Sequence, residues 1–213
     1  KVPELAKTML SHQRNPIKTS LTLLDGPVAK TACAAFKALL GYTGDRPNAN
    51  PNGVALQFLT AGYDSPDVQA ELYMQIIKQL TDSPTEFCRT QCWNMLVLCL
   101  WNYAPPHGLD DFLTVFCLEQ HAEGHRFVSL MHKTQNEGAL YGSASRLPSY
   151  EQLPAILNGF FSVEQTRSRS RWSIDEGARP VSLDDGLMTR MRMSMSKIGY
   201  PEGATGVLAP TPE

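Results

Sequence analysis

Apolar residues recur every three or four positions over most of the chain, which is the spacing of one buried helix face. Four such stripes follow one another: Val68, Leu72, Ile76 and Leu80; Cys88, Cys92, Met95, Cys99 and Tyr103; Leu109, Phe112, Leu113, Phe116 and Cys117; Phe127, Leu130 and Met131. The strict alternation of a half-buried strand does not interrupt them. The pattern predicts an all-α fold, a compact multi-helix bundle with short connections.

Four dipeptides predict helix starts because each places a capping residue before a proline: Asn15-Pro16, Gly26-Pro27, Ser65-Pro66 and Ser83-Pro84. Proline at the first helical position sacrifices no hydrogen bond, since the amide there has no partner within the helix. Ser83 and Glu86 also have the spacing of a capping box. Residues 44–52 are predicted to form a looser loop.

The chain changes character after residue 140. Residues 142–145 have linker composition, residues 149–158 predict a short helix, and the Asp-Asp-Gly turn at 184–186 favours a β-hairpin over residues 181–195. We therefore predict a helical domain over residues 3–145. Residues 146–213 are predicted to be a linker and a loosely structured extension that starts this hairpin.

Composition places the chain among globular proteins, with 42% hydrophobic and 19% charged residues. A formal net charge of −2 creates no overall attraction to nucleic acid or anionic lipid. The apolar run at 95–101 is far shorter than the roughly 20 residues that cross a bilayer. The five cysteines do not resemble a disulfide scaffold, and the first residues do not resemble a signal peptide. We expect a reduced, cytoplasmic segment of a longer chain.

Several strings, in order along the chain, resemble the myosin tail homology 4 (MyTH4) domain of unconventional myosins and some kinesins. Residues 16–21 resemble its opening helix, and residues 36–47 resemble its helix ending in Met-Gly-Asp-x-Pro, with Thr43 replacing methionine. The most specific string, residues 71–80, is followed by Trp93, Leu96 and a Pro-Pro loop. The family-like structural residues are Gly44, Asp45, Pro47, Glu71, Tyr73, Gln75, Lys78, Gln79 and Trp93.

The resemblance implies a non-catalytic interaction module in a cytoskeletal motor tail. Such a module binds cargo protein tails or microtubules together with an adjacent FERM domain, and associates with the cytoskeleton. Residues 146–156 are similar to the segment that leads into the first FERM lobe, so residues 146–213 would begin that lobe. A helical scaffold or adaptor in a non-motor cytoskeletal protein is the alternative. We expect no catalytic residues, cofactor, metal or nucleic-acid partner.

Two groups of polar residues allow more than one interpretation. Glu71, Gln75, Lys78 and Gln79 lie on a helix that otherwise looks buried, which favours a structural network between helices over a groove that faces a partner. The residues proposed to contact partners are basic: Lys18, Lys30, Lys37, Arg46, Arg126, Lys133, Arg167, Arg169 and Arg171. For those before residue 140, a surface of scattered, solvated charges is the favoured interpretation.

The Ser/Arg run at 166–172 would bind an acidic partner or accept phosphate, although a solvated loop is the favoured interpretation. Asp110, Asp111 and Glu119 occupy a helix that carries a lysine stripe in some members of the family. This difference favours cargo over a direct contact with tubulin.

Two side-chain pairs have the spacing of metal ligands on one helix face, His121 with His125 and Cys88 with Cys92. The histidine pair lacks an evident third ligand, and Gly124 loosens the helix, so a solvated helix end is favoured. The two cysteines stand among apolar residues, which favours core packing.

Overall fold

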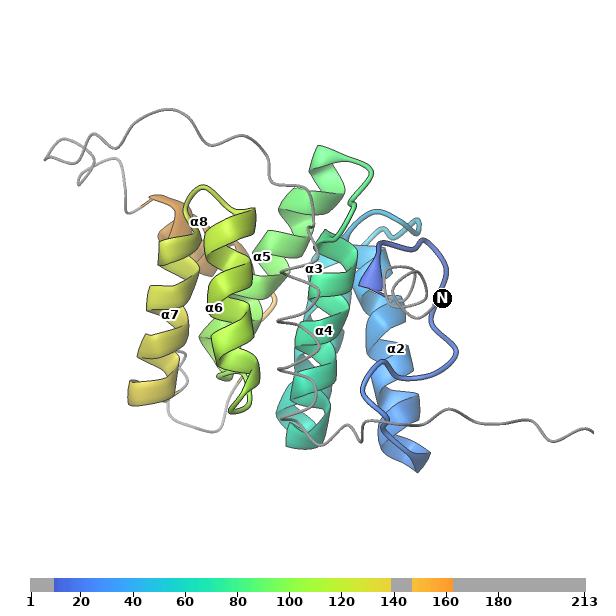
Figure 1. Cartoon of the computed structure of the whole chain (residues 1–213). Helices are drawn as coiled ribbons and strands as arrows, with labels where there is room; N and C mark the ends of the chain where they lie inside the picture. Colours follow the sequence, from blue (N-terminus) through green and yellow to red (C-terminus); the bar gives the residue numbers. More distant parts are fainter. Residues whose placement is uncertain (1–9, 139–146, 163–213) are drawn as a thin grey trace, which may run out of the picture.

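The computed structural model describes residues 10–138 and 147–162, and the described part of the chain is all-α (Figure 1). The predicted multi-helix bundle is confirmed. The hairpin predicted over 181–195 and the linker at 142–145 lie outside the described residues. The elements are α2 (Gly26–Tyr42), α3 (Pro51–Asp64), a 3-10 turn η1 (Pro66–Val68), α4 (Gln69–Leu80), α5 (Glu86–Asn102), α6 (Leu109–Gln120), α7 (Gly124–Glu137) and α8 (Leu153–Ser162).

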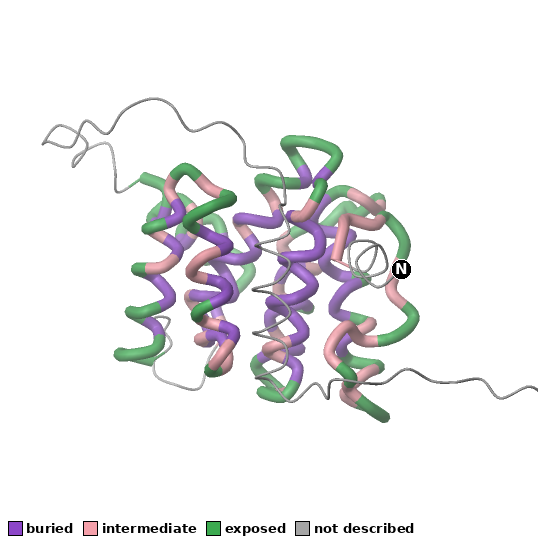
Figure 2. The backbone as a smooth tube through the Cα atoms, viewed as in Figure 1, coloured by how far each residue is buried: buried purple, intermediate pink, exposed green. Residues whose placement is uncertain are grey.

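Helix α4 lies at the centre of one half of the bundle and is buried on all sides from residue 71 to residue 80. It packs against α2, α3 and α5, and α5 continues the core to α7 and α8. In Figure 2 the buried residues are concentrated along α4 and α5, whereas they alternate with exposed residues along α7 and α8. The four predicted stripes are all buried, so the apolar spacing identified the core correctly. None of the described helices is long and apolar enough to cross a membrane.

Two of the four predicted helix starts agree with the structure. Pro27 lies in the first turn of α2, and Pro66 opens the 3-10 turn that leads into α4. A start outside the prediction occurs at Asn50, whose side chain accepts a hydrogen bond of 2.9 Å from Gly53 N. Helix α3 thus begins inside the predicted loop at 44–52.

The other two predicted starts are wrong. The cap of α5 is Thr85, two residues after Ser83. Its side chain accepts a hydrogen bond of 3.1 Å from Cys88 N. No helix begins at Asn15-Pro16, because the backbone of this N-terminal segment (residues 10–24) forms hydrogen bonds with side chains of α4. A local sequence pattern does not report such distant partners.

Helix α8 begins four residues later than the predicted helix at 149–158 and packs against α5. Its Leu153, Ile156 and Phe160 belong to the same hydrophobic core as the other helices. The boundary predicted after residue 145 stays a prediction, but the core receives side chains from both sides of it.

Gly124 allows the turn between α6 and α7 to be tight. A Cβ atom at this position would overlap the backbone of Cys117 and Leu118. The glycine that looked like a weak point inside one helix therefore opens a second helix, α7, against the end of α6.

Candidate functional site

The polar face of α4 holds the N-terminal segment against the bundle. The carboxylate of Glu71 accepts hydrogen bonds from Leu21 N at 2.8 Å, from Thr22 N at 2.7 Å and from the Thr22 hydroxyl at 2.6 Å. Glu71 is 0% exposed, so the charge is compensated by donors from a segment about 50 residues earlier.

Three further side chains of α4 continue these contacts. Gln75 Nε2 donates to Ala32 O in α2 at 2.9 Å, and Lys78 Nζ donates to Ser11 O at 2.6 Å. Gln79 exchanges two hydrogen bonds with the backbone of Gln13, at 3.0 and 3.1 Å. Burial lowers the pKa of the Lys78 amino group. The four residues form one internal network, which joins α4 to α2 and mainly to a non-helical segment.

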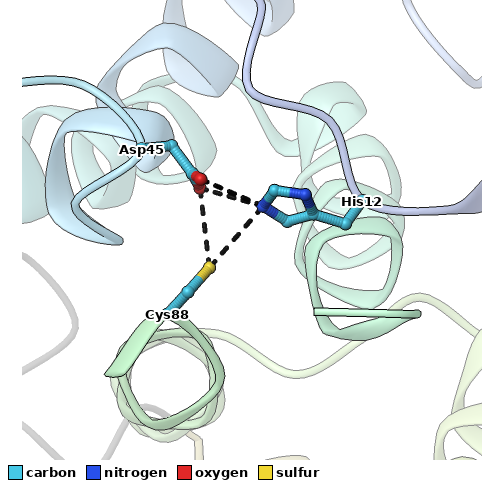
Figure 3. A group of neighbouring side chains, drawn as sticks. All are labelled: His12, Asp45 and Cys88. Carbon is cyan, nitrogen blue, oxygen red and sulfur yellow. Dashed lines mark hydrogen bonds and ion pairs between the residues drawn. The ribbon is translucent and has the colours of Figure 1, made fainter. Parts of the chain in front are cut away.

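Asp45 connects this network to a compact group formed with His12 and Cys88 (Figure 3). His12 Nε2 lies 3.1 and 3.2 Å from the two Asp45 oxygens. Cys88 Sγ lies 3.5 Å from Asp45 Oδ2 and 3.7 Å from His12 Nε2. The Asp45 carboxylate also accepts from Thr43 Oγ1 at 2.8 Å and from Gln79 Nε2 at 3.3 Å.

The pKa of the Cys88 thiol is lowered by its neighbours. The neighbouring Cys92 thiol donates a hydrogen bond to it, which outweighs burial and lowers the pKa of Cys88 to about 6. The same hydrogen bond, together with burial, raises the pKa of Cys92 well above its ordinary value. The sequence pattern assigned both cysteines to the core, where they do lie, but it contained no sign of the partners of Cys88.

The remaining family-like residues make structural contacts. Tyr73 is buried and donates to Tyr103 O at 2.6 Å. The Trp93 ring packs on the rings of α6, α7 and His121. Gly44 has a φ of +81° and lies against the ring of Phe87, and Pro47 is exposed in the loop that follows.

The two histidines considered as zinc ligands do not face each other as a pair. His121 is the C-cap of α6, and its Nδ1 accepts a hydrogen bond of 3.0 Å from Glu123 N. Its ring packs against Trp93 and Phe127. His125 is exposed on the next helix. The helix break before Gly124 removes the shared face that a spacing of four would create.

The basic residues proposed as partner contacts do not gather in one place. Exposed Lys18 lies in the N-terminal segment, exposed Lys30 and Lys37 lie on α2, and half-buried Arg46 follows α2. The other two described ones, Arg126 and Lys133, lie on α7. Figure 1 shows α2 and α7 at opposite ends of the bundle. Arg167, Arg169 and Arg171 lie outside the described residues.

Arg126 has internal partners. Its guanidinium donates to Glu123 at 3.0 Å and lies 4.9 Å from the centre of the Phe160 ring. The contact with Glu123 lies within the start of α7, and the contact with Phe160 connects α7 to α8. Such a side chain is less available to a partner than an exposed lysine.

Residues 55–153 match the family model of the MyTH4 domain. This chain contains a MyTH4 domain. A relative of the chain is the high molecular weight form of myosin-1 from Acanthamoeba castellanii, which is 34% identical over 69% of this chain and 9% of its own length. Human unconventional myosin-XVB is 27% identical over 71% of this chain and 5% of its own length. The MyTH4-containing chain thus spans less than a tenth of these relatives.

Solved MyTH4-FERM structures share the fold. The MF1 unit of Dictyostelium discoideum myosin VII, in a mutant form, has a TM-score of 0.62 at 19% identity, over 71% of this chain and 33% of that one. The C-terminal unit of human myosin 7b, solved in complex with the harmonin-a PDZ3 domain, has a TM-score of 0.60 at 23% identity, over 68% of this chain and 32% of that one. The MyTH4 fold of this chain corresponds to about a third of each structure.

Proposed function

We propose that this MyTH4 domain is a non-catalytic, protein-binding module in the tail of a myosin and that it acts together with an adjacent FERM domain. The observation that carries the proposal is the MyTH4 match at residues 55–153, which falls on the helices that form the core. The myosin relatives favour a motor tail over a non-motor scaffold. The expected partners are the adjacent FERM domain and the tails of cargo proteins. We expect the parent protein to associate with the cytoskeleton.

The internal chemistry supports a binding role. The polar side chains of α4 are engaged in hydrogen bonds within the chain, and their buried positions give a substrate no access. Cys88, the thiol with the lowered pKa, is only 2% exposed. A nucleophile must contact its substrate, so Cys88 would require the bundle to open.

Binding to the FERM domain of the same parent protein tests the proposal. The 213-residue chain is titrated by calorimetry with that domain. The expected result is saturable binding of one FERM domain per chain with a negative heat-capacity change, because apolar surface is buried. A parent protein without a FERM domain, or a titration without binding heat at two temperatures, would overturn the proposed pairing.

Direct microtubule binding is the second candidate, favoured by the positions of Lys30 and Lys37. They are seven residues apart on α2, two helical turns, and both are exposed, so they share one face. Against this candidate, Asp110, Asp111 and Glu119 place negative charge on α6. Among the described residues, the basic candidates are divided between α2 and α7 at opposite ends of the bundle, so protein cargo is the better-supported partner class.

A further inference from the structure

The group formed by His12, Asp45 and Cys88 joins three parts of the chain that are distant in sequence. His12 comes from the N-terminal segment, Asp45 from the connection between α2 and α3, and Cys88 from the first turns of α5 (Figure 3). The three offer one nitrogen, one oxygen and one sulfur atom within 4.8 Å of one another. Among the described residues, no other group of three or more His, Cys, Asp or Glu side chains has its ligand atoms this close together.

The contacts meet at a single atom of the imidazole. Both Asp45 oxygens and the Cys88 sulfur approach Nε2 of His12, at 3.1, 3.2 and 3.7 Å. In a catalytic relay the carboxylate and the nucleophile contact opposite ring nitrogens, so that a proton can pass through the ring. Convergence on one nitrogen does not create such a path. Instead, the nitrogen, oxygen and sulfur atoms lie close to one another, as ligand atoms do around a metal ion.

The separations of the donor atoms agree with the edges of a tetrahedron around zinc. Zinc lies about 2.0–2.2 Å from nitrogen and oxygen ligands and about 2.3 Å from sulfur, which gives edges of about 3.3–3.7 Å. For Asp45 Oδ2, the oxygen that contacts both partners, the observed separations are 3.2 Å for nitrogen to oxygen, 3.5 Å for sulfur to oxygen and 3.7 Å for sulfur to nitrogen. A mixed N, O and S donor set suits zinc and excludes magnesium and calcium, which prefer oxygen alone.

We propose that His12, Asp45 and Cys88 form a zinc-binding site that fastens the N-terminal segment to the helical bundle. The Asp45 carboxylate already has the outer contacts that orient metal ligands, from Thr43 Oγ1 at 2.8 Å and Gln79 Nε2 at 3.3 Å. Little solvent reaches the group, because the side chains of His12 and Asp45 are 8% and 6% exposed. The fourth position is left for a ligand from outside the group, as in other three-ligand sites.

The site has a structural role in this proposal. Residues 11–24 are not helical, and hydrogen bonds to side chains of α4 attach them to the bundle. A metal bound to His12 adds a second attachment, to α5 and to the loop after α2. Zinc that binds the folded chain but not the unfolded chain raises the stability of the fold by mass action.

Zinc binding is measured on the 213-residue chain after treatment with a chelator. Competition with a chromophoric chelator gives the affinity, and elemental analysis of dialysed protein gives the stoichiometry. We expect one zinc ion per chain and no binding of magnesium or calcium. His12→Ala, Asp45→Asn and Cys88→Ser should each weaken zinc binding by more than about tenfold, and Thr43→Val by about tenfold through the orientation of Asp45.

Two variants serve as matched controls. His132→Ala removes an exposed histidine of α7, and Cys33→Ser removes a cysteine of α2 outside the group. Both should bind zinc as the unchanged chain does. Zinc that stays bound with unchanged affinity in all three ligand variants, or that is lost in the controls, would overturn the site.

Cobalt gives a test that does not depend on the folding of any variant. Cobalt bound in place of zinc to the unchanged chain should show the near-ultraviolet charge-transfer band of a thiolate ligand and the visible bands of a tetrahedral ion. As a comparison, the cobalt spectrum of the Cys88→Ser chain should lack the charge-transfer band. Circular dichroism of this variant should show that its helices are retained. Absence of that band in the unchanged chain contradicts the proposal, and the group is then a hydrogen-bonded triad alone.

Discussion

At the residue scale, Glu71 shows how a buried charge specifies the path of a neighbouring segment. Its carboxylate accepts hydrogen bonds from the backbone amides of Leu21 and Thr22, which do not lie in a helix. A buried carboxylate without these donors would be strongly unfavourable, so the segment and the charge require each other. A polar residue on an otherwise apolar helix predicts such a network, but not which segment supplies the donors.

Glu71→Gln keeps the shape of the side chain but places an amide NH2 against amide and hydroxyl donors. We expect the free energy of unfolding to fall by about 2 kcal/mol, because hydrogen bonds to a charged acceptor are lost. Chemical denaturation measures this change. Glu86→Gln on the exposed start of α5 should cost less than about 0.5 kcal/mol. Equal effects of the two substitutions would contradict the role of Glu71.

His121 makes stability depend on pH. Burial is the largest cause that lowers its pKa below the ordinary 6.5, and Arg126 lowers it further against the opposing effect of Glu123. The unfolded chain therefore takes up the proton more readily than the folded chain. The contribution of His121 to stability is fully present above pH 6.5 and is lost as pH falls through the lower, folded pKa.

The comparison with His121→Gln tests this pH dependence, since glutamine offers an acceptor for Glu123 N but does not titrate. The free energy of unfolding is measured in steps from neutral pH downwards. The unchanged chain should lose more stability on acidification than the variant. Parallel curves would show that His121 does not contribute to the acid sensitivity.

The His12, Asp45 and Cys88 group marks the limit of prediction at this scale. Asp45 stood out through its family-like string, but His12 and Cys88 are 76 positions apart. Apolar periodicity reports which face of a helix is buried. It carries no information about which distant side chain will meet that face.

At the scale of elements, the stripes predicted the helices well because burial of one face repeats along each of them. Helix starts were predicted less well. Thr85 caps α5 although Ser83 precedes the proline, and Asn50 caps α3 inside an expected loop. Several capping residues near one another compete, and the packing of the helix decides among them.

Helix α8 provides a sharp test of whether the bundle extends past residue 145. Phe160 packs against Phe127 with ring centres 5.1 Å apart and is 8% exposed, whereas its neighbour Phe161 is 37% exposed. We expect Phe160→Ala to lower the free energy of unfolding by about 3 kcal/mol, because it leaves a cavity in the core. Phe161→Ala should cost less than about 1 kcal/mol.

Denaturation of the 213-residue chain and of the two variants measures these differences. If α8 belongs to the folding unit, the unfolding of all three chains should remain a single transition. A small and equal effect of both substitutions would place the boundary at residue 145, as the composition of the chain predicts.

At the scale of the whole molecule, the distribution of charge predicts weak microtubule binding. The net charge is −2, and the basic candidates on described helices lie on α2 and on α7, at opposite ends of the bundle. We expect co-sedimentation with microtubules only at low salt, with loss near 0.15 M, where screening reduces attraction beyond about 8 Å.

Charge reversal distinguishes the two ends of the bundle. Lys30→Glu with Lys37→Glu on α2 should remove the remaining low-salt co-sedimentation, whereas Lys133→Glu on α7 should leave most of it. Tight binding that survives high salt would restore tubulin as the main partner.

The central claim is that the chain is a binding module of a myosin tail, and the parent protein tests it most directly. Actin-activated ATP hydrolysis and binding of a separately added FERM domain are measured for a parent from which the FERM domain has been removed, with and without residues 10–162. The deletion should leave ATP hydrolysis unchanged and abolish FERM binding. Loss of ATP hydrolysis with retained FERM binding, or a parent without motor activity, would contradict the claim.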